Sequence, residues 1–289
     1  MKKFLLSLAI IFSCASAVSA QNGTTTGSNT DAYGVDLSSR YMQLVGEADQ
    51  ASAAAQWMRA DSLLVAAMRA EPANPLNIML MSNLGMIRFY QGNDSLALLT
   101  LDAANRMEPR ATIVLTNRAK VKVATGDTDG AIADWNSVLE IDSTNVATRY
   151  LRSIALLRRG DADGAEKDAY WLRDNAPKDP RTDLAMGTLL SSTARYQEAI
   201  PYLNHSIETE PAAELYAARA LCNLMTGNLN EASSDISEGM RLDPADGELY
   251  LYRALLNRMR YRPDDARADA RRAVELGVAA SRAQALLDN

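Results

Sequence analysis

Residues 81–109 read MSNLGMIRFYQGNDSLALLTLDAANRMEP. Small and large apolar residues recur there at intervals of four and three positions, as in Ala97, Leu101 and Ala104. Residues three and four apart lie on one face of an α-helix, so the spacing predicts a helix with one apolar face. Gly92 precedes this triplet by five residues, where one helix ends and the next begins. The stretch therefore predicts a helix, a turn and a second helix.

The same pattern recurs along the chain. Glycines at positions 92, 126 and 160 are spaced 34 residues apart, and most windows close on a proline. Six triplets follow a common spacing, with an alanine, a mostly large apolar residue four positions later and a mostly small residue three positions after that. These triplets are Ala60-Leu64-Ala67, Ala97-Leu101-Ala104, Ala131-Trp135-Val138, Ala199-Leu203-Ser206, Ala232-Ile236-Gly239 and Ala266-Ala270-Ala273. The period predicts stacked helix pairs, because a single pair cannot bury its apolar face alone.

A period of 34 residues built from helix, turn, helix and turn resembles the tetratricopeptide repeat (TPR) family. Seven windows can be counted, at 41–74, 78–111, 112–145, 146–179, 180–212, 213–246 and 247–280, and five of them match in register. The resemblance implies an all-α fold, a right-handed superhelical solenoid of about seven helix-turn-helix repeats. It also implies that the first helix of each pair lines the concave side. Residues 281–289 are expected to form a C-terminal cap.

The N-terminal segment predicts export. Lys2 and Lys3 precede a short apolar run, and Val18-Ser19-Ala20 supplies small residues of the type that signal peptidase prefers. Residues 1–20 are therefore interpreted as a secretory signal peptide, because the apolar run is far shorter than the about 20 residues of a membrane span. The mature chain is then expected to be exported, and to be periplasmic in a Gram-negative bacterium.

An alternative remains for the same segment. Ile11-Phe12-Ser13-Cys14 resembles the lipid-attachment box of bacterial lipoproteins, in which Cys14 would carry a lipid anchor. Residues 21–40 are rich in Gly, Asn and Thr and have no hydrophobic period, so they are expected to form a flexible linker.

Composition argues against most catalytic and nucleic-acid-binding functions. The chain has 30 basic and 36 acidic residues, a net charge of −6, whereas nucleic acids and anionic membranes attract a positive surface. The single histidine, His205, cannot build a His-rich zinc site and is interpreted as a helix-surface residue. Cys222 is expected to be a small buried side chain, with a disulfide between chains as the alternative if it is exposed. We therefore expect no catalytic residue, no metal site and no cofactor.

Four windows carry an arginine and, sixteen residues later, an aspartate. The pairs are Arg118/Asp134, Arg152/Asp168, Arg219/Asp235 and Arg253/Asp269. The arginine lies in the middle of the first helix and the aspartate in the second, so an antiparallel hairpin brings them together. The arginines are either partners in ion pairs that fix the register of the two helices or a basic ladder for an acidic ligand. The recurrence of the carboxylate favours ion pairs, for which the planar guanidinium is suited.

The expected inner faces of the first helices carry aromatic, methionine, aliphatic and cationic side chains, which are common in protein interfaces. The candidate partner-binding residues are Phe89, Tyr90, Lys120, Tyr150, Ile154, Arg158, Leu221, Leu224, Met225, Leu251, Tyr252 and Arg258. They form either a groove for an apolar, weakly acidic peptide or the packing between neighbouring helices. A Lys/Asn clamp for a C-terminal carboxylate, as some TPR proteins have, is not predicted, because the required residues do not recur.

Together these features predict an exported, non-enzymatic scaffold or adaptor that binds a peptide or protein partner in its concave groove. Envelope assembly and secretion are plausible settings. One alternative is an accessory subunit that positions an enzyme or a glycan-handling complex. Another is a self-associating structural array. No nucleic-acid partner and no membrane span are expected, and function beyond binding does not follow from the fold.

Overall fold

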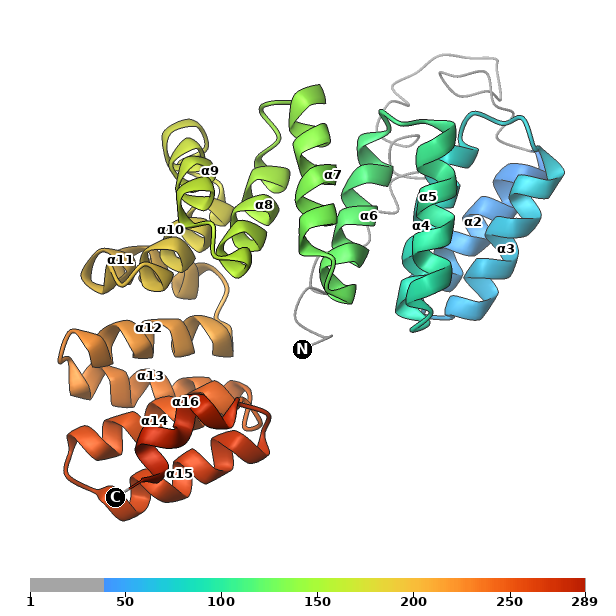
Figure 1. Ribbon diagram of the computed structural model, residues 1–289. Coiled ribbons are helices and arrows are strands. Elements are labelled where there is room, and N and C mark those ends of the chain that lie inside the picture. The colour runs from blue at the N-terminus through green and yellow to red at the C-terminus, as the bar shows by residue number, and fades with distance from the viewer. Residues whose placement is uncertain (1–38, 289) are drawn as a thin grey trace. The chain divides into compact units, whose positions relative to one another are not determined.

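The computed structural model describes residues 39–288. The predicted signal peptide, Cys14 and most of the predicted linker lie outside the described residues. Within them the chain forms fifteen α-helices and no strand (Figure 1). The helices are α2 (Arg40–Ala53), α3 (Trp57–Ala70), α4 (Asn77–Tyr90), α5 (Asp94–Met107), α6 (Thr112–Thr125), α7 (Thr128–Ile141), α8 (Val146–Arg159), α9 (Ala162–Asn175), α10 (Pro180–Ser192), α11 (Tyr196–Thr209), α12 (Ala213–Met225), α13 (Leu229–Leu242), α14 (Gly247–Met259), α15 (Pro263–Glu275) and α16 (Ala280–Leu287).

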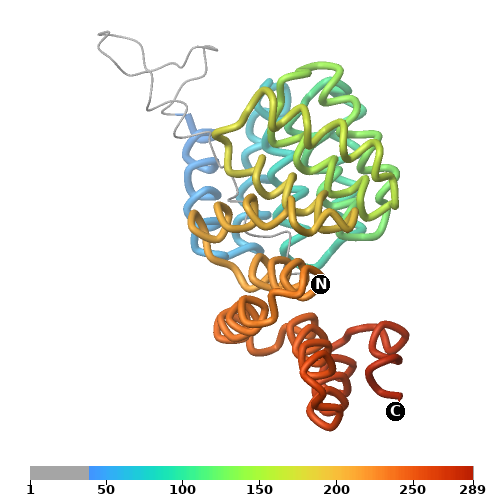
Figure 2. Tube along the Cα trace, turned by 90° about the vertical axis from the view of Figure 1, so that its left-hand side faces the viewer, coloured from blue at the N-terminus to red at the C-terminus, as the bar shows by residue number. Residues whose placement is uncertain are grey.

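The helices form seven consecutive pairs, from α2/α3 to α14/α15, and α16 follows the last pair. The all-α array of about seven helix pairs is therefore confirmed. The chain divides into two compact units, the first ending at Thr148 and the second beginning at Arg149. The boundary falls near the start of α8. Figure 2 traces the chain, with the last helices of the second unit, α14 to α16, in red.

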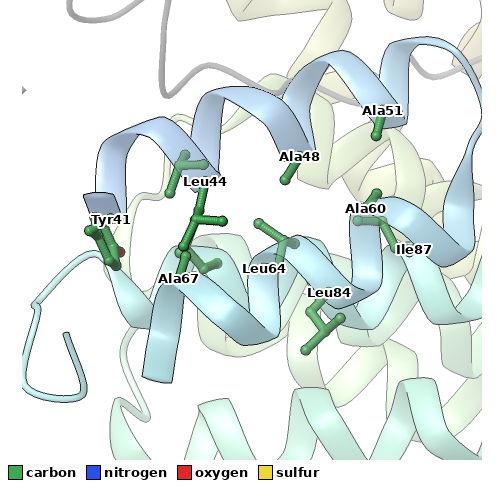
Figure 3. Packing of buried hydrophobic residues seen from close by; sticks show 11 residues of the cluster. Tyr41, Leu44, Ala48, Ala51, Ala60, Leu64, Ala67, Leu84 and Ile87 are labelled. Carbon is green, nitrogen blue, oxygen red and sulfur yellow. The ribbon is translucent and has the colours of Figure 1, made fainter. Parts of the chain in front are cut away.

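Buried apolar side chains join neighbouring pairs within a unit. In the first unit, Leu44 and Ala48 of α2 face Leu64 of α3, and Leu84 and Ile87 of α4 complete the cluster (Figure 3). All five are at most 5% exposed. Because α4 belongs to the following pair, the cluster buries apolar surface that the first pair would otherwise leave in water.

Small residues set how closely the helices approach. A Cβ atom added to Gly85 of α4 would lie 2.5 Å from Leu101 Cγ of α5, and one added to Gly187 of α10 would lie 2.9 Å from Leu203 Cδ2 of α11. A contact of 2.5 Å is far inside the ordinary separation of carbon atoms. Glycine at these two positions therefore allows the two helices of its hairpin to pack closely. Gly46 of α2 has no such role, because no atom lies within 4 Å of a Cβ added there.

Each of the seven turns between the two helices of a pair contains a residue in the left-handed backbone region. Gly92 has a φ of 80°, as the repeat pattern suggests. Three pairs have a residue with a Cβ atom at this place instead of glycine, with φ of 54° at Ala55, 59° at Ala194 and 58° at Tyr261. This conformation costs about 1–2 kcal/mol for a residue with a Cβ, so the helix packing on both sides must hold it.

All four arginine–aspartate pairs are present in the structure. The Nη2–Oδ1 distance is 2.6 Å in the first two pairs and 2.5 Å in the last two, and in each pair the arginine Nε also donates to the same aspartate. The aspartate side chains are at most 10% exposed. Each guanidinium thus binds a buried carboxylate with two donors, which fixes the register of the two helices.

A third donor links the arginine to the preceding pair. Arg118 Nη1 donates to Asp102 Oδ1 of α5 at 3.1 Å, and Arg219 Nη1 donates to Asn204 Oδ1 of α11 at 2.8 Å. One arginine therefore joins three helices. Sequence reasoning missed this link because Asp102 and Asn204 differ in charge and share only their place in the repeat.

Asparagines donate further hydrogen bonds to two of the ion-paired aspartates, Asp235 and Asp269. Asn223 Nδ2 donates to Asp235 Oδ2, and Asn257 Nδ2 donates to Asp269 Oδ2, each at 3.0 Å. Each asparagine lies four residues after the arginine of its own pair, one turn further along the first helix. Both oxygens of each carboxylate are therefore bonded within the hairpin.

Asp168 receives its extra hydrogen bond from an unexpected position. In the other three pairs the residue four places after the arginine donates to the aspartate, as Lys122 Nζ does at 2.9 Å to Asp134. In α8 that place is Leu156, and Arg149 Nη1 donates to Asp168 Oδ1 at 3.1 Å instead. Two guanidinium groups therefore share one carboxylate.

Asp168→Ala is expected to destabilise the second unit by about 3 kcal/mol, because it leaves two partly buried arginines without their carboxylate. Asp264→Ala is the matched control, since the Asp264 side chain is 92% exposed and its pair with Arg267 contributes at most about 1 kcal/mol. Thermal unfolding followed by circular dichroism gives the comparison. Equal melting temperatures for the two variants would show that the buried pair does not hold the hairpin.

Gly85→Ala is expected to lower the melting temperature, because its Cβ collides with the branched carbon of Leu101. Gly46→Ala is expected to raise it, since Gly46 is helical and unobstructed and alanine is the better helix former by about 1 kcal/mol. The same thermal melts test both changes. A stabilising Gly85→Ala would mean that the α4–α5 spacing adjusts freely.

Candidate functional site

The first helices of successive pairs contact one another. In the first unit α4 contacts α6, and in the second unit α10 contacts α12 and α12 contacts α14. We call the surface formed by these helices in each unit its first-helix face. All twelve candidate partner-binding residues lie on first helices, namely α4, α6, α8, α12 and α14. Whether they bind a partner stays a prediction.

Two of the twelve candidates are core residues, and their assignment to a binding surface is corrected here. Leu224 is 1% exposed and packs with Ala220 and Ile236. Leu251 is 7% exposed and packs in a cluster that includes Leu286 of α16. The helical spacing placed both on the expected inner side, but the neighbouring helix pair and α16 cover them.

The aspartates of the ion pairs are also core residues and form no part of a functional surface. Asp235 is 3% exposed and Asp269 is 7% exposed, and Asp134 and Asp168 are buried as well. A partner molecule cannot reach carboxylates that are enclosed and already bonded within their own hairpins. Their arginines are engaged by the same carboxylates, so the alternative of a basic ladder for an acidic ligand is corrected in favour of structural ion pairs.

The remaining partner-binding candidates keep some exposed surface. Met225 is 53% exposed, and Arg158 and Arg258 are also exposed. The half-buried candidates are Phe89, Tyr90, Lys120, Tyr150, Ile154, Leu221 and Tyr252. Ile113, which is 41% exposed near the start of α6, was not among the candidates. Its place four residues before Asn117 on one helical stripe could have identified it.

Aromatic packing holds Tyr90 at the end of α4. Its ring stacks on Trp57 of α3 with centroids 5.1 Å apart and an interplanar angle of 24°, and Phe89 lies at 5.9 Å in a tilted arrangement. Burial raises the pKa of Tyr90. The stack fixes the orientation of Tyr90, so its ring is part of a rigid edge rather than an adaptable contact.

Tyr252 belongs to a polar cluster with the C-terminal helix. Arg282 of α16 donates to the carboxylate of Glu248 on α14, with Nη2 and Oε2 2.7 Å apart. Burial is the main cause that raises the pKa of Tyr252 far above its usual value, and the Glu248 carboxylate adds to it. Tyr252 is therefore partly engaged with the C-terminal helix.

Tyr150 lies in a basic neighbourhood within the second unit. Burial raises the pKa of its hydroxyl, and the positive charges of Arg158 and Arg181 oppose that shift. Arg181 itself binds Asp179 through two donors, at 2.8 and 2.7 Å. The guanidinium of Arg158 has no such carboxylate among the described residues.

Lys120 is the unusual charge of the first unit. Its side chain is half-buried on α6, and burial lowers the pKa of its ammonium. Between residues 39 and 288 it has no hydrogen-bond or ion-pair partner. On the same side of α6, Asn117 Nδ2 donates to Ser82 Oγ of α4 at 3.0 Å. This bond places Lys120, one helical turn later, beside the seam between α4 and α6.

The thiol is enclosed in the core, whereas the imidazole lies at the surface beside a carboxylate. Cys222 is fully buried, as expected, and burial raises the pKa of its thiol to about 11, so the thiolate nucleophile is scarce near neutral pH. His205 Nδ1 lies 2.6 Å from Asp183 Oδ2 on the exposed side of α11. In the described region no group of three or more His, Cys, Asp or Glu side chains is arranged to hold a metal ion.

None of the described helices combines the length and the apolar character that crossing a bilayer requires.

Known proteins share the repeat architecture of this chain. No protein-family model matches the chain. Human DnaJ homolog subfamily C member 3 is 26% identical over 170 residues, which cover 53% of this chain. The chain spans about a third of that relative's length, 34%.

Two solved structures extend the likeness to most of the chain. A tetratricopeptide repeat protein from Parabacteroides merdae is 27% identical, with a TM-score of 0.68 over 86% of this chain and 97% of that one. PilW, a widely conserved type IV pilus biogenesis factor, is 14% identical, with a TM-score of 0.63 over 75% of this chain and 100% of its own. The helix pairs, their period and these likenesses show that the chain has the tetratricopeptide repeat fold.

Proposed function

We propose that this chain is an exported, non-enzymatic adaptor that binds a peptide or protein segment on the first-helix faces of its repeats. Envelope assembly or secretion is the proposed setting. Export rests on the signal-like N-terminus, Lys2 to Ala20. Binding rests on exposed methionines at equivalent places on two neighbouring first helices.

The pair of methionines in the second unit carries the proposal. Met225 at the end of α12 and Met259 at the end of α14 are 34 residues apart, so they occupy the same place in successive repeats. They are 53% and 39% exposed, and their two helices contact each other. Unbranched thioethers adapt to irregular apolar surfaces, and exposed apolar side chains that gather on one surface favour a protein partner.

The chemistry of the described side chains supports binding rather than turnover. Cys222 is sealed in the core and protonated. His205 lies on the second helix of its pair, so it is not part of a first-helix face. A nucleophile and a general base must meet at one place to act together.

Site-specific crosslinking tests the proposed surface. A photoreactive side chain placed at position 225 or 259 is expected to crosslink a partner in extract of the native cell. Position 58 or 107 is the control, because Met58 and Met107 are 81% and 61% exposed but lie on second helices. Crosslinks from the control positions and none from the first helices would place the partner on the opposite side and contradict the proposal.

Substitution of the same residues gives the affinity test. Met225→Ser with Met259→Ser is expected to weaken binding of the crosslinked partner at least tenfold, about 1.4 kcal/mol, as interface anchors do. Met58→Ser with Met107→Ser should change it less than about twofold, since those residues lie away from the site. Equal losses for the two double variants would show that methionine content, not the first-helix face, determines binding. A partner that proves to be a second copy of this chain would favour the self-associating alternative.

A further inference from the structure

Helices α4 and α6 carry cations but no carboxylate. Neither Asn77–Tyr90 nor Thr112–Thr125 contains an aspartate or glutamate. Three of their four cations reach a carboxylate on another helix. Arg88 binds Asp61 of α3 at 2.9 Å, and Arg118 and Lys122 bind Asp134 of α7 at 2.6 and 2.9 Å. The fourth cation, Lys120, reaches no carboxylate among the described residues.

The helical register explains why Lys120 has no carboxylate partner in the described part of the chain. Arg118 and Lys122 are four residues apart, so they share the side of α6 that faces α7. Lys120 lies midway between them in sequence and therefore on the opposite side of the helix. That side faces α4, where Asn117 bonds to Ser82. Asp134 is consequently out of reach of the Lys120 ammonium.

Apolar side chains flank Lys120 along the seam. Ile113, Asn117 and Lys120 form one stripe on α6, and Ser82, Met86 and Phe89 form the parallel stripe on α4, with the Asn117–Ser82 bond between them. Ile113 is 41% exposed and Phe89 is half-buried. The seam therefore presents apolar surface on both sides of a single ammonium.

A half-buried ammonium without a counter-ion is unfavourable, because it loses hydration and gains no pairing. Loss of hydration on burial lowers the pKa of the Lys120 ammonium. A carboxylate brought to the seam would restore the missing charge, and in partly dry surroundings the attraction exceeds that of an exposed pair. The net charge of the chain, −6, repels acidic molecules from most of its surface, so this seam differs from its surroundings.

We propose that the first-helix face of α4 and α6 binds an apolar peptide segment that carries one acidic side chain, whose carboxylate pairs with the Lys120 ammonium. The inference rests on the proposed function and specifies the partner's chemistry. A segment lying along the seam has apolar surface before and after Lys120. The carboxylate therefore comes from an aspartate or glutamate within the segment rather than from a chain terminus.

Selection from a library of random twelve-residue peptides, displayed with both ends fused so that no terminus is free, tests this inference on the full mature chain. Peptides enriched by the wild type are expected to combine apolar residues with one aspartate or glutamate. Replacing that residue by its amide is expected to weaken binding about tenfold for the wild type and less than about twofold for Lys120→Met. Lys178→Met is the control, since Lys178 is exposed in the turn before α10 and should leave the tenfold preference intact.

The outcomes separate this inference from the proposed function. Enrichment of apolar peptides without an acidic residue, or an acid preference that persists in Lys120→Met, would overturn the role of Lys120 and leave peptide binding in place. Enrichment of no peptide by any variant would contradict both. Peptides that bind the wild type through their acid and lose only that preference in Lys120→Met would support both.

A stability measurement checks the premise. Lys120→Met keeps an unbranched side chain in the seam and removes the unpaired charge, so it is expected to raise the melting temperature by about 2 °C. Lys122→Met removes a paired ammonium and is expected to lower it. A lower melting temperature for Lys120→Met would show that the ammonium is already paired in the free protein and would overturn the inference.

Discussion

The buried bond between arginine and aspartate determines how each hairpin presents its surface. A carboxylate such as Asp168, with a side chain 1% exposed, must be paired, so the arginine of the first helix has to face the second helix. That requirement fixes the rotation of the first helix about its own axis. Residues two positions from the arginine then lie roughly 200° around the helix. The interior ion pair thus selects which side chains form the first-helix face, Lys120 among them.

The 34-residue period and the helical spacing of apolar residues were sufficient to predict the helix pairs, because a helix pair is determined by the sequence within one repeat. The same holds for the four ion pairs, whose partners are always sixteen residues apart within one hairpin. The turns were harder. Gly92 marks its turn, but Ala55, Ala194 and Tyr261 adopt the left-handed conformation that a sequence pattern assigns to glycine. There the packed helices on either side impose the turn, and no local residue signals it.

Exposure was the least predictable property, because it depends on elements that are distant in sequence. Leu224 and Leu251 have the helical spacing of inner-face residues, yet the following pair covers the first and α16 helps to cover the second. Lys120 shows the converse. The sequence places Asp134 fourteen residues away, and only the register of α6 shows that this carboxylate lies on the other side of the helix. Locating the candidate site therefore required the structure, although the sequence was enough to predict which types of residue form it.

The short sequence separation of the closing contacts bears on how the protein forms. The partners of each ion pair are sixteen residues apart, and even the bond from Tyr41 to Asn77 between neighbouring pairs spans only 36. Loops of this size close quickly and at little entropic cost. A hairpin can therefore assemble as soon as its own two helices are available, before the rest of the chain exists. A terminal pair can also open and close again while the interior pairs keep their structure, as in other arrays whose units contact only their neighbours.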